Sequence, residues 1–249
     1  MKPAFTFIIG YRHRQDRIVN LRRTLDWLYS FNNCEIILVE QDTHSKIEQF
    51  SFRVNHIFTY SDKAYNRSWA FNVGLRHSTS DIVVFGDSDI IMEHSNFVES
   101  LKEVANYDVV SPYKSVVDLE PNEVYQSFSN IFKISRPGRG ENDNQKINLC
   151  GGIVIFKREA AVKIAGWPEE YIGWGAEDNA QTHKVENFLT FKEMPYRCFH
   201  LWHQREQPDM QLYQRNLQIL NQFVQFDKEK LLKYINSNIS KIGFKNKYA

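Results

Sequence analysis

Two adjacent carboxylates, Glu177 and Asp178, follow a tryptophan that stands between two glycines in the stretch YIGWGAEDN, residues 171–179. Carboxylates beside a flexible aromatic turn are candidates for chemistry on a polar substrate. The same pair also suits the first turn of a helix, where acidic side chains meet exposed N–H groups and the positive end of the helix dipole. The local sequence is compatible with both interpretations.

A second pair of acids, Asp87 and Asp89, lies in the stretch GDSD directly after an apolar run. Two carboxylates at the end of a strand can face one pocket, and hard oxygen ligands of this kind hold a divalent cation that bridges a diphosphate. His200 and His203 form the stretch HLWH, and imidazole together with carboxylate favours a manganese-like ion over calcium. The alternatives are a turn with side-chain caps and two ordinary histidines beside aromatic residues.

Cationic and amide side chains occur at two further places. Arg12, Arg14 and Arg17 come directly after the first apolar run, where guanidinium groups can bind phosphates. Asn66 and Arg67 stand just before a helical pattern, where they could contact a nucleotide or its phosphates. A solvated helix start and a helix cap are the ordinary interpretations of these two stretches.

Buried strands and helices alternate over the first hundred residues. The pattern predicts strands around residues 4–11, 34–42, 54–61 and 81–92 and helices around residues 14–31 and 68–78. This order is typical of a parallel, doubly wound α/β sheet, whose ligands lie beyond the carboxyl ends of the strands. The GDSD stretch lies at such an end. Further on, the pattern predicts a polar loop over residues 136–149, a strand and short helix over 150–167, and helix from Met210 onward.

The composition is that of an ordinary globular chain of 249 residues, with 42% hydrophobic and 24% charged residues. A net charge of about +1 argues against a nucleic-acid partner bound by bulk electrostatics. The three cysteines are widely spaced, which predicts buried free thiols in a reducing compartment. No apolar run approaches the length of a membrane span, and the N-terminal stretch is typical of a strand and not of a signal peptide.

Taken in order, five stretches resemble the metal-dependent glycosyltransferases of GT-A fold, in particular the β-1,4-galactosyltransferase group and the related chondroitin-polymerase modules. The stretches are GYRHRQDR, YNRSWAFNVG, FGDSDII, CGGIVIFKREAAVKIAGWPEEYIGWGAEDN and RCFHLWH. The resemblance implies a Rossmann-like, doubly wound, mostly parallel sheet in a single domain, residues 1–249. It implies a nucleotide-binding half over residues 1–110, an acceptor and catalytic half over 111–209, and a C-terminal helical tail over 210–249.

The resemblance also implies roles for the residues singled out above. Asp178 would be the general base, and Glu177 would hold hydroxyl groups of the donor sugar. Asp89 and His203 would ligate Mn²⁺, with Mg²⁺ as the alternative ion, and His200 would be a third protein ligand.

Other residues would bind the two substrates. The UDP would be contacted by arginines of the GYRHRQDR loop and by the YNRSW stretch, and the ribose or the metal shell by Asp87. Gly151 and Gly152 would leave room for the donor sugar. Trp174 would lie near both the donor diphosphate and the acceptor, and Asn179 would help to seat the acceptor. The donor-binding residues are thus Arg12, Arg14, Asn66, Arg67, Asp87, Gly151, Gly152 and Trp174.

The implied reaction is a single-displacement, inverting transfer of galactose or N-acetylgalactosamine from a UDP-sugar to a hydroxyl group of a saccharide or lipid-linked glycan. A Lewis-acidic metal neutralises the leaving diphosphate, and a carboxylate that accepts the acceptor proton contributes about 100- to 10,000-fold to the rate. Leu149 stands where galactosyl-transferring members carry a tyrosine. The smaller side chain leaves room for a 2-acetamido group, so we expect UDP-GalNAc to be used at least as well as UDP-galactose.

Two departures from the family pattern leave the acceptor open: Ile172 replaces a loop tryptophan, and Asn179 replaces a third acid. We expect a cytoplasmic protein, with a weak contact between the lysine-bearing tail and the inner face of a membrane or else a solvated terminal helix. The alternative functions are a retaining enzyme resembling the polypeptide GalNAc-transferases, a metal-dependent nucleotide-sugar hydrolase or nucleotidyltransferase, and a non-catalytic sugar-binding module.

Overall fold

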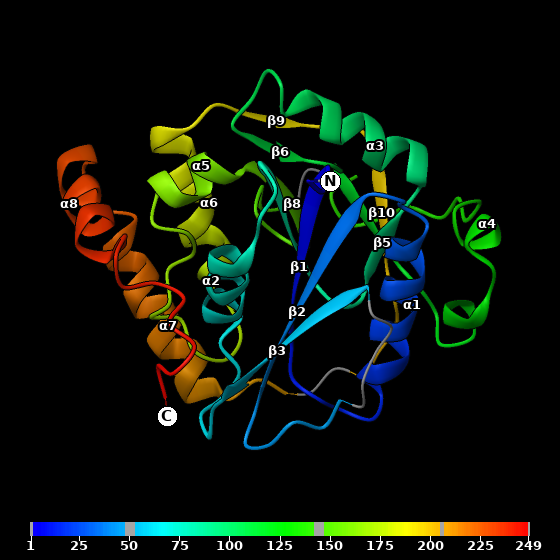
Figure 1. Ribbon diagram of the computed structural model, residues 1–249, viewed down its shortest axis with the longest axis horizontal. Helices are drawn as coiled ribbons and strands as arrows, with labels where there is room; N and C mark the ends of the chain where they lie inside the picture. Colours follow the sequence, from blue (N-terminus) through cyan, green and yellow to red (C-terminus); the bar gives the residue numbers. More distant parts are fainter. Residues whose placement is uncertain (1, 48–52, 142–146, 205–206, 249) are drawn as a thin grey trace.

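A computed structural model describes residues 2–47, 53–141, 147–204 and 207–248 (Figure 1). Its centre is a seven-stranded sheet with the strand order β3-β2-β1-β4-β8-β6-β9. The first four strands of this order are mutually parallel, whereas β8 runs antiparallel to both β4 and β6. The strands are β1 (Phe5–Tyr11), β2 (Cys34–Asp42), β3 (Val54–Tyr60), β4 (Ile82–Gly86), β6 (Val109–Ser111), β8 (Ile153–Lys157) and β9 (Phe191–Glu193).

A second, three-stranded sheet has the order β5-β10-β7. Its central strand β10 (Arg197–His200) pairs antiparallel with β5 (Ile90–Met92) and parallel with β7 (Ser115–Asp118). The strand predicted over residues 81–92 is therefore two strands, β4 in the large sheet and β5 in the small one. The GDSD turn joins them, so these acids lie where the two sheets meet.

Helices cover both faces of the large sheet (Figure 1). Helices α1 and α3 lie on one side with the short α4, and α2 lies on the other side with α5 to α8. The helices are α1 (Arg17–Tyr29), α2 (Arg67–His77), α3 (His94–Glu103), α4 (Phe128–Ile131), α5 (Arg158–Lys163), α6 (Glu177–Phe188), α7 (Met210–Phe223) and α8 (Lys228–Asn238). The expected α/β fold, a mostly parallel sheet flanked by helices in a single domain, is confirmed. Among the described helices, none is both long and apolar enough to cross a membrane.

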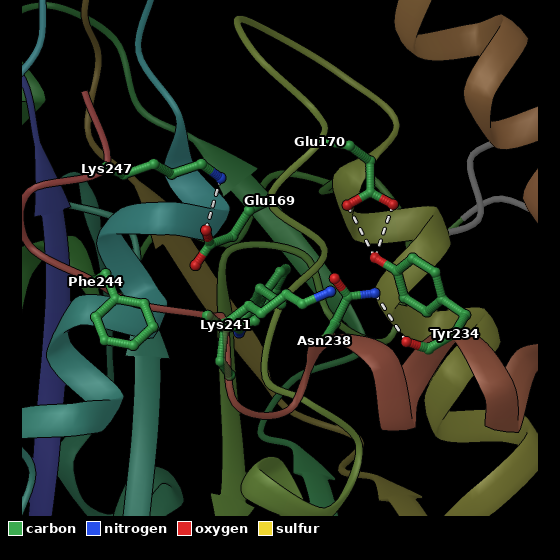
Figure 2. A pocket seen from close by; sticks show the side chains of 9 residues that line it. Glu169, Glu170, Tyr234, Asn238, Lys241, Phe244 and Lys247 are labelled. Atoms are coloured by element: carbon green, nitrogen blue, oxygen red, sulfur yellow. Dashed lines mark hydrogen bonds and ion pairs between the residues drawn. The ribbon is translucent and has the colours of Figure 1, made fainter.

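The residues after α7 fold back against the body of the protein (Figure 2). The Tyr234 hydroxyl of α8 donates to both carboxylate oxygens of Glu170, at 2.7 and 2.9 Å. The Lys247 ammonium lies 2.7 Å from the Glu169 carboxylate. A hollow of about 430 Å³ lies between these contacts, lined also by Phe244 and Lys241. The tail is thus packed onto the domain through these polar contacts and through Leu231 and Ile235 of α8, which are buried in an apolar core.

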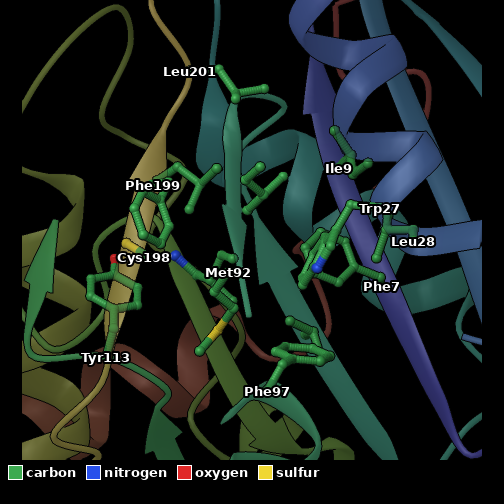
Figure 3. Close-up of a cluster of buried hydrophobic side chains, with 14 of the residues drawn as sticks. Phe7, Ile9, Trp27, Leu28, Met92, Phe97, Tyr113, Cys198, Phe199 and Leu201 are labelled. Atoms are coloured by element: carbon green, nitrogen blue, oxygen red, sulfur yellow. Dashed lines mark hydrogen bonds between the residues drawn. The ribbon is translucent and has the colours of Figure 1, made fainter. Parts of the chain in front are cut away.

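Alternation along β1 fills a separate core on each face of the sheet. Phe7 and Ile9 belong to the core under α1 and α3, whereas Ile8 belongs to the core under α2. The first core is aromatic: the Trp27 ring lies 5.9 Å from Phe7 in an edge-to-face contact. Figure 3 shows that this core continues into the small sheet, through residues such as Phe199. The small sheet is therefore fixed to the large one by apolar packing.

All three cysteines are free, as the sequence predicts. Cys150 and Cys198 are buried, whereas Cys34 is only partly buried. Burial raises the pKa of the Cys34 thiol to about 12, which keeps it protonated and unreactive at neutral pH.

Candidate active site

The GDSD turn is held against a glycine pair from the loop before β8. The Asp87 amide donates to the Gly152 carbonyl at 3.0 Å. Gly152 has φ +58°, and a Cβ there would lie 2.3 Å from the Tyr113 hydroxyl, so only glycine fits without strain. A Cβ on Gly151 would instead lie 3.7 Å from an Asp178 carboxylate oxygen. Of the predicted pair, Gly151 faces the Asn148 carbonyl and Asp178, and Gly152 faces Tyr113.

Asp89, His200 and His203 form a group that could hold a metal ion, because one ligand atom from each lies within 4.8 Å of the others. Asp89 Oδ2 lies 3.5 Å from His203 Nε2 and 3.9 Å from His200 Nε2. Asp89 is buried, and its carboxylate is a hard ligand beside two borderline imidazoles. This donor set fits Mn²⁺.

Different environments control the charges of the two histidines. Burial opposes the charge on His200, yet its hydrogen bond to Asp118 and the nearby Asp89 carboxylate together raise its pKa. Burial lowers the pKa of His203 and favours its neutral form. A neutral imidazole is the form that binds a metal ion, so metal binding and proton release are coupled at this site.

Arg67 joins the two acidic motifs. Its Nε lies 2.6 Å from Asp87 Oδ1, and its Nη1 lies 2.5 Å from Asp178 Oδ1 and 3.8 Å from Glu177 Oε1. The guanidinium also lies 5.1 Å from the centre of the Trp167 ring. Arg67 begins α2, so the start of this helix holds together the end of β4 and the start of α6.

Carboxylates outnumber cations around Arg67. Burial, reinforced by neighbouring carboxylates, raises the pKa of Glu177 to about 7 and that of Asp87 to about 6, although Arg67 opposes both shifts. Glu177, Asp178 and Asp87 share this one arginine, and a further carboxylate, Asp89, follows two residues after Asp87 in the sequence. The site therefore carries excess negative potential, which a divalent cation would balance.

The stretch YIGWGAEDN satisfies both interpretations of its acids. Glu177 and Asp178 form the first turn of α6, and Ala176 before them has φ +78°. Their carboxylates also lie against Arg67 in the site. In the turn before this helix, Gly173 and Gly175 have φ values of +78° and +99°, a conformation that glycine adopts without strain.

Helix α7 supplies two residues, Tyr213 and Asn216, that contact the turn before α6. The exposed Trp174 ring lies 5.2 Å from the Tyr213 ring. The fully buried Asn216 amide donates to the carbonyls of Ile172, Trp174 and Gly175, at 3.0, 3.4 and 3.2 Å. Their only sequence signal is a polar residue within a helical pattern, so the contact could not have been predicted.

We expect Asn216→Ala to destabilise the protein by about 1–3 kcal/mol, because it leaves buried carbonyls without their donor. Urea denaturation measures this loss, and hydrogen exchange over residues 172–176 should increase. The matched control is Asn221→Ala, an exposed position on the same helix. Equal stability of the two variants would contradict the idea that the Asn216 hydrogen bonds stabilise the turn before α6.

The arginines after β1 have three different environments. The Arg12 guanidinium donates to the carbonyls of Gln41, Lys63 and Ser61 and so ties together the ends of neighbouring strands. Arg14 binds the Asp16 carboxylate. Arg17, the first residue of α1, has its Nη1 3.6 Å from Asp89 Oδ2 and so reaches the candidate metal group.

Asn66 and Asn179, both predicted to bind a substrate, have hydrogen-bond partners other than Arg67. Asn66 is buried, caps α2 by accepting from the Trp69 amide at 2.9 Å, and donates to the Glu169 carbonyl. Asn179 donates to the Asn148 side chain at 3.2 Å near the surface. Asn66 thus holds the start of the helix that carries Arg67.

Two family models match the chain. Glycosyl transferase family 2 matches residues 14–165, which is more than half of the chain. The N-terminal domain of galactosyltransferase matches residues 142–203, which include the glycine pair, the α6 acids and both histidines. None of the curated proteins compared matches the chain.

Solved structures of similar fold include S. aureus TarS, alone and in complex with UDP-GlcNAc. Both are 16% identical to this chain, with a TM-score of 0.58. Each match covers 97% of this chain; it covers 72% of the TarS chain alone and 74% of the TarS chain in the complex. A mutant of Drosophila β-1,4-galactosyltransferase 7 in complex with manganese, UDP-Gal and xylobiose is also 16% identical, with a TM-score of 0.49 over 76% of this chain. The present chain spans 63% of that structure, less than two thirds. The likeness to TarS supports the GT-A fold.

Proposed function

The chain belongs to glycosyl transferase family 2, and we propose that it transfers galactose or N-acetylgalactosamine from a UDP-sugar to a hydroxyl group of a saccharide acceptor. One observation carries the proposal. Arg67 holds Asp87 at 2.6 Å and Asp178 at 2.5 Å, so the GDSD turn, which also carries the candidate metal ligand Asp89, lies beside the candidate base. In a metal-dependent, inverting transfer, the base would act on the acceptor hydroxyl that attacks the anomeric carbon, and the metal on the diphosphate that leaves from it.

Mn²⁺ would be held by Asp89, His203 and His200, whose donor atoms fit this ion better than calcium. When bound, the ion would neutralise the diphosphate of the departing UDP. Arg17, with its guanidinium 3.6 Å from Asp89, would add a second positive charge at the same place. The excess of carboxylates around Arg67 supports a requirement for such a cation.

Asp178 is the proposed base. Its carboxylate would accept the proton of the acceptor hydroxyl while that oxygen forms a bond to the anomeric carbon and the bond to UDP breaks on the opposite face. This single displacement inverts the anomeric centre. Gly151, which has no side chain beside the Asp178 carboxylate, leaves space there for the donor sugar. The exposed Trp174 ring would support the acceptor.

The donor preference rests on Leu149, which is buried and smaller than a tyrosine. We therefore propose that UDP-GalNAc serves at least as well as UDP-galactose. The acceptor is a saccharide or a lipid-linked glycan. The lysines of the tail are exposed. We further propose that they make a weak contact with an anionic membrane surface. The cytoplasmic location stays a prediction.

The test is product analysis with UDP-galactose, UDP-GalNAc, UDP-GlcNAc and UDP-glucose, each with mixed saccharide acceptors and with Mn²⁺ or chelator. We expect metal-dependent transfer from UDP-GalNAc at a rate at least equal to that from UDP-galactose, with an inverted anomeric configuration by NMR. A retained configuration would indicate the retaining class. UDP release without a glycan product would indicate a hydrolase, and UDP binding without turnover a sugar-binding module.

A further inference from the structure

The small sheet places a carboxylate beside His200. In the β-register, the Cα of His200 pairs with Asp118 of β7 on one side and with Ile90 of β5 on the other. The Leu119 amide donates to the His200 carbonyl at 2.9 Å, and the Leu201 amide donates to the Asp89 carbonyl at 2.7 Å. Backbone hydrogen bonds thus place Asp118 and His200 in one row of the small sheet, with Asp89 one residue before the Ile90 position of that row.

A hydrogen bond orients the His200 ring within this row. His200 Nδ1 lies 2.9 Å from Asp118 Oδ1, and Nε2 faces Asp89 Oδ2 at 3.9 Å. His203 has the same orientation, with Nδ1 3.1 Å from the Gln204 carbonyl and Nε2 turned toward Asp89. Both rings therefore offer Nε2 to the candidate metal position.

Asp118 is itself held from its other side. Arg139 Nε donates to Asp118 Oδ2 at 2.9 Å, and Nη2 donates to Oδ1 at 3.1 Å. The backbone of Arg139 forms an antiparallel bridge with Val116, two residues before Asp118. A fork of this kind fixes the plane of the carboxylate as well as its position.

We propose that Asp118 is a positioning residue for the metal ion, which keeps the proton of His200 on Nδ1 and leaves the Nε2 lone pair for the ion. The inference rests on the metal requirement of the proposed function. Carboxylates that accept the second N–H of a ligating histidine fix its tautomer and its ring orientation and raise its basicity. Arg139 supports the metal site by holding Asp118.

A role in stability alone explains this arrangement poorly. The side chains of Asp118 and Arg139 are 38% and 45% exposed, and exposed ion pairs contribute little to stability. The hydrogen bond between Asp118 Oδ1 and His200 Nδ1 connects this ion pair to the candidate metal group. Loss of Asp118 should therefore change metal affinity more than stability.

The test measures Mn²⁺ affinity of the full chain without donor or acceptor, from the EPR signal of free Mn²⁺. We expect Asp118→Asn to weaken Mn²⁺ binding about 10- to 100-fold. Arg139→Gln should weaken it less, in the same direction. The matched control is Glu120→Gln, which removes a carboxylate from the same hollow of about 350 Å³ but leaves the His200–Asp118 bond. Equal affinities of Asp118→Asn and Glu120→Gln would overturn the inference.

The tautomer gives a second readout that needs no variant. At alkaline pH, ¹⁵N NMR of His200 should show the proton on Nδ1 in the native protein and a shift toward Nε2 in Asp118→Ala, which has no acceptor for the Nδ1 proton. A native proton on Nε2 would overturn the inference even if the variant failed to fold. Absence of Mn²⁺ binding by the native protein would instead refute the metal requirement of the proposed function and the inference with it.

Discussion

Replacing Asp178 by asparagine should reduce the rate of transfer about 100- to 10,000-fold, the usual contribution of a general base. The amide has the shape of the carboxylate but cannot accept the proton of the acceptor hydroxyl. Its oxygen can still accept from Arg67, whose Nη1 lies 2.5 Å from Asp178 Oδ1, so the site should keep its geometry. The measurement is the initial rate of transfer with a saturating UDP-sugar, alongside the UDP dissociation constant in Mn²⁺.

Two further variants make this result specific. Glu186→Gln removes an exposed carboxylate from the same helix and should leave the rate unchanged. Glu177→Gln should raise the KM for the donor more than it lowers kcat, because Glu177 is assigned to hydroxyls of the donor sugar. A larger loss of kcat in Glu177→Gln than in Asp178→Asn would exchange the roles of the two acids. Full activity of Asp178→Asn would refute the proposed mechanism.

Replacing Asp89 by asparagine should remove the metal dependence of UDP binding and lower transfer by about 1,000-fold, since a Lewis acid contributes several kcal/mol. Asp89 Oδ2 lies 3.5 Å from His203, 3.9 Å from His200 and 3.6 Å from Arg17. Without this carboxylate, the ion would lose the anionic member of its three candidate ligands, while the Arg17 guanidinium would remain close by. Calorimetric titration of UDP with Mn²⁺ and with chelator measures the loss.

The matched control is Asp81→Asn, just before the opposite end of β4, where the side chain is exposed. It should bind UDP with the same metal dependence as the native protein. Chelator should bring the native protein to the level of Asp89→Asn. Metal-dependent UDP binding that survives in Asp89→Asn would mean that the ion is held elsewhere.

The fold could be predicted from the sequence because its signals are local. Apolar runs at β1, β2 and β4 are typical of buried strands, and Ile18, Leu21, Leu25 and Leu28 have the spacing of the α1 face that packs on β1. The acids of GDSD and YIGWGAEDN also stand at element ends that the pattern marks. The small sheet was not predicted, because its strands have only three or four residues each and pair across the chain.

The sequence by itself thus determined the fold class, the element order near the N-terminus and the residue types able to do chemistry. Only the tertiary structure decided which of them meet. Arg67 reaches Asp178 across 111 positions, and Asp118 meets His200 across 82, because strand order and register bring distant element ends together. A periodic pattern specifies which face of a helix or strand is buried. It does not specify the neighbour against which that face packs, and here the neighbours complete the site.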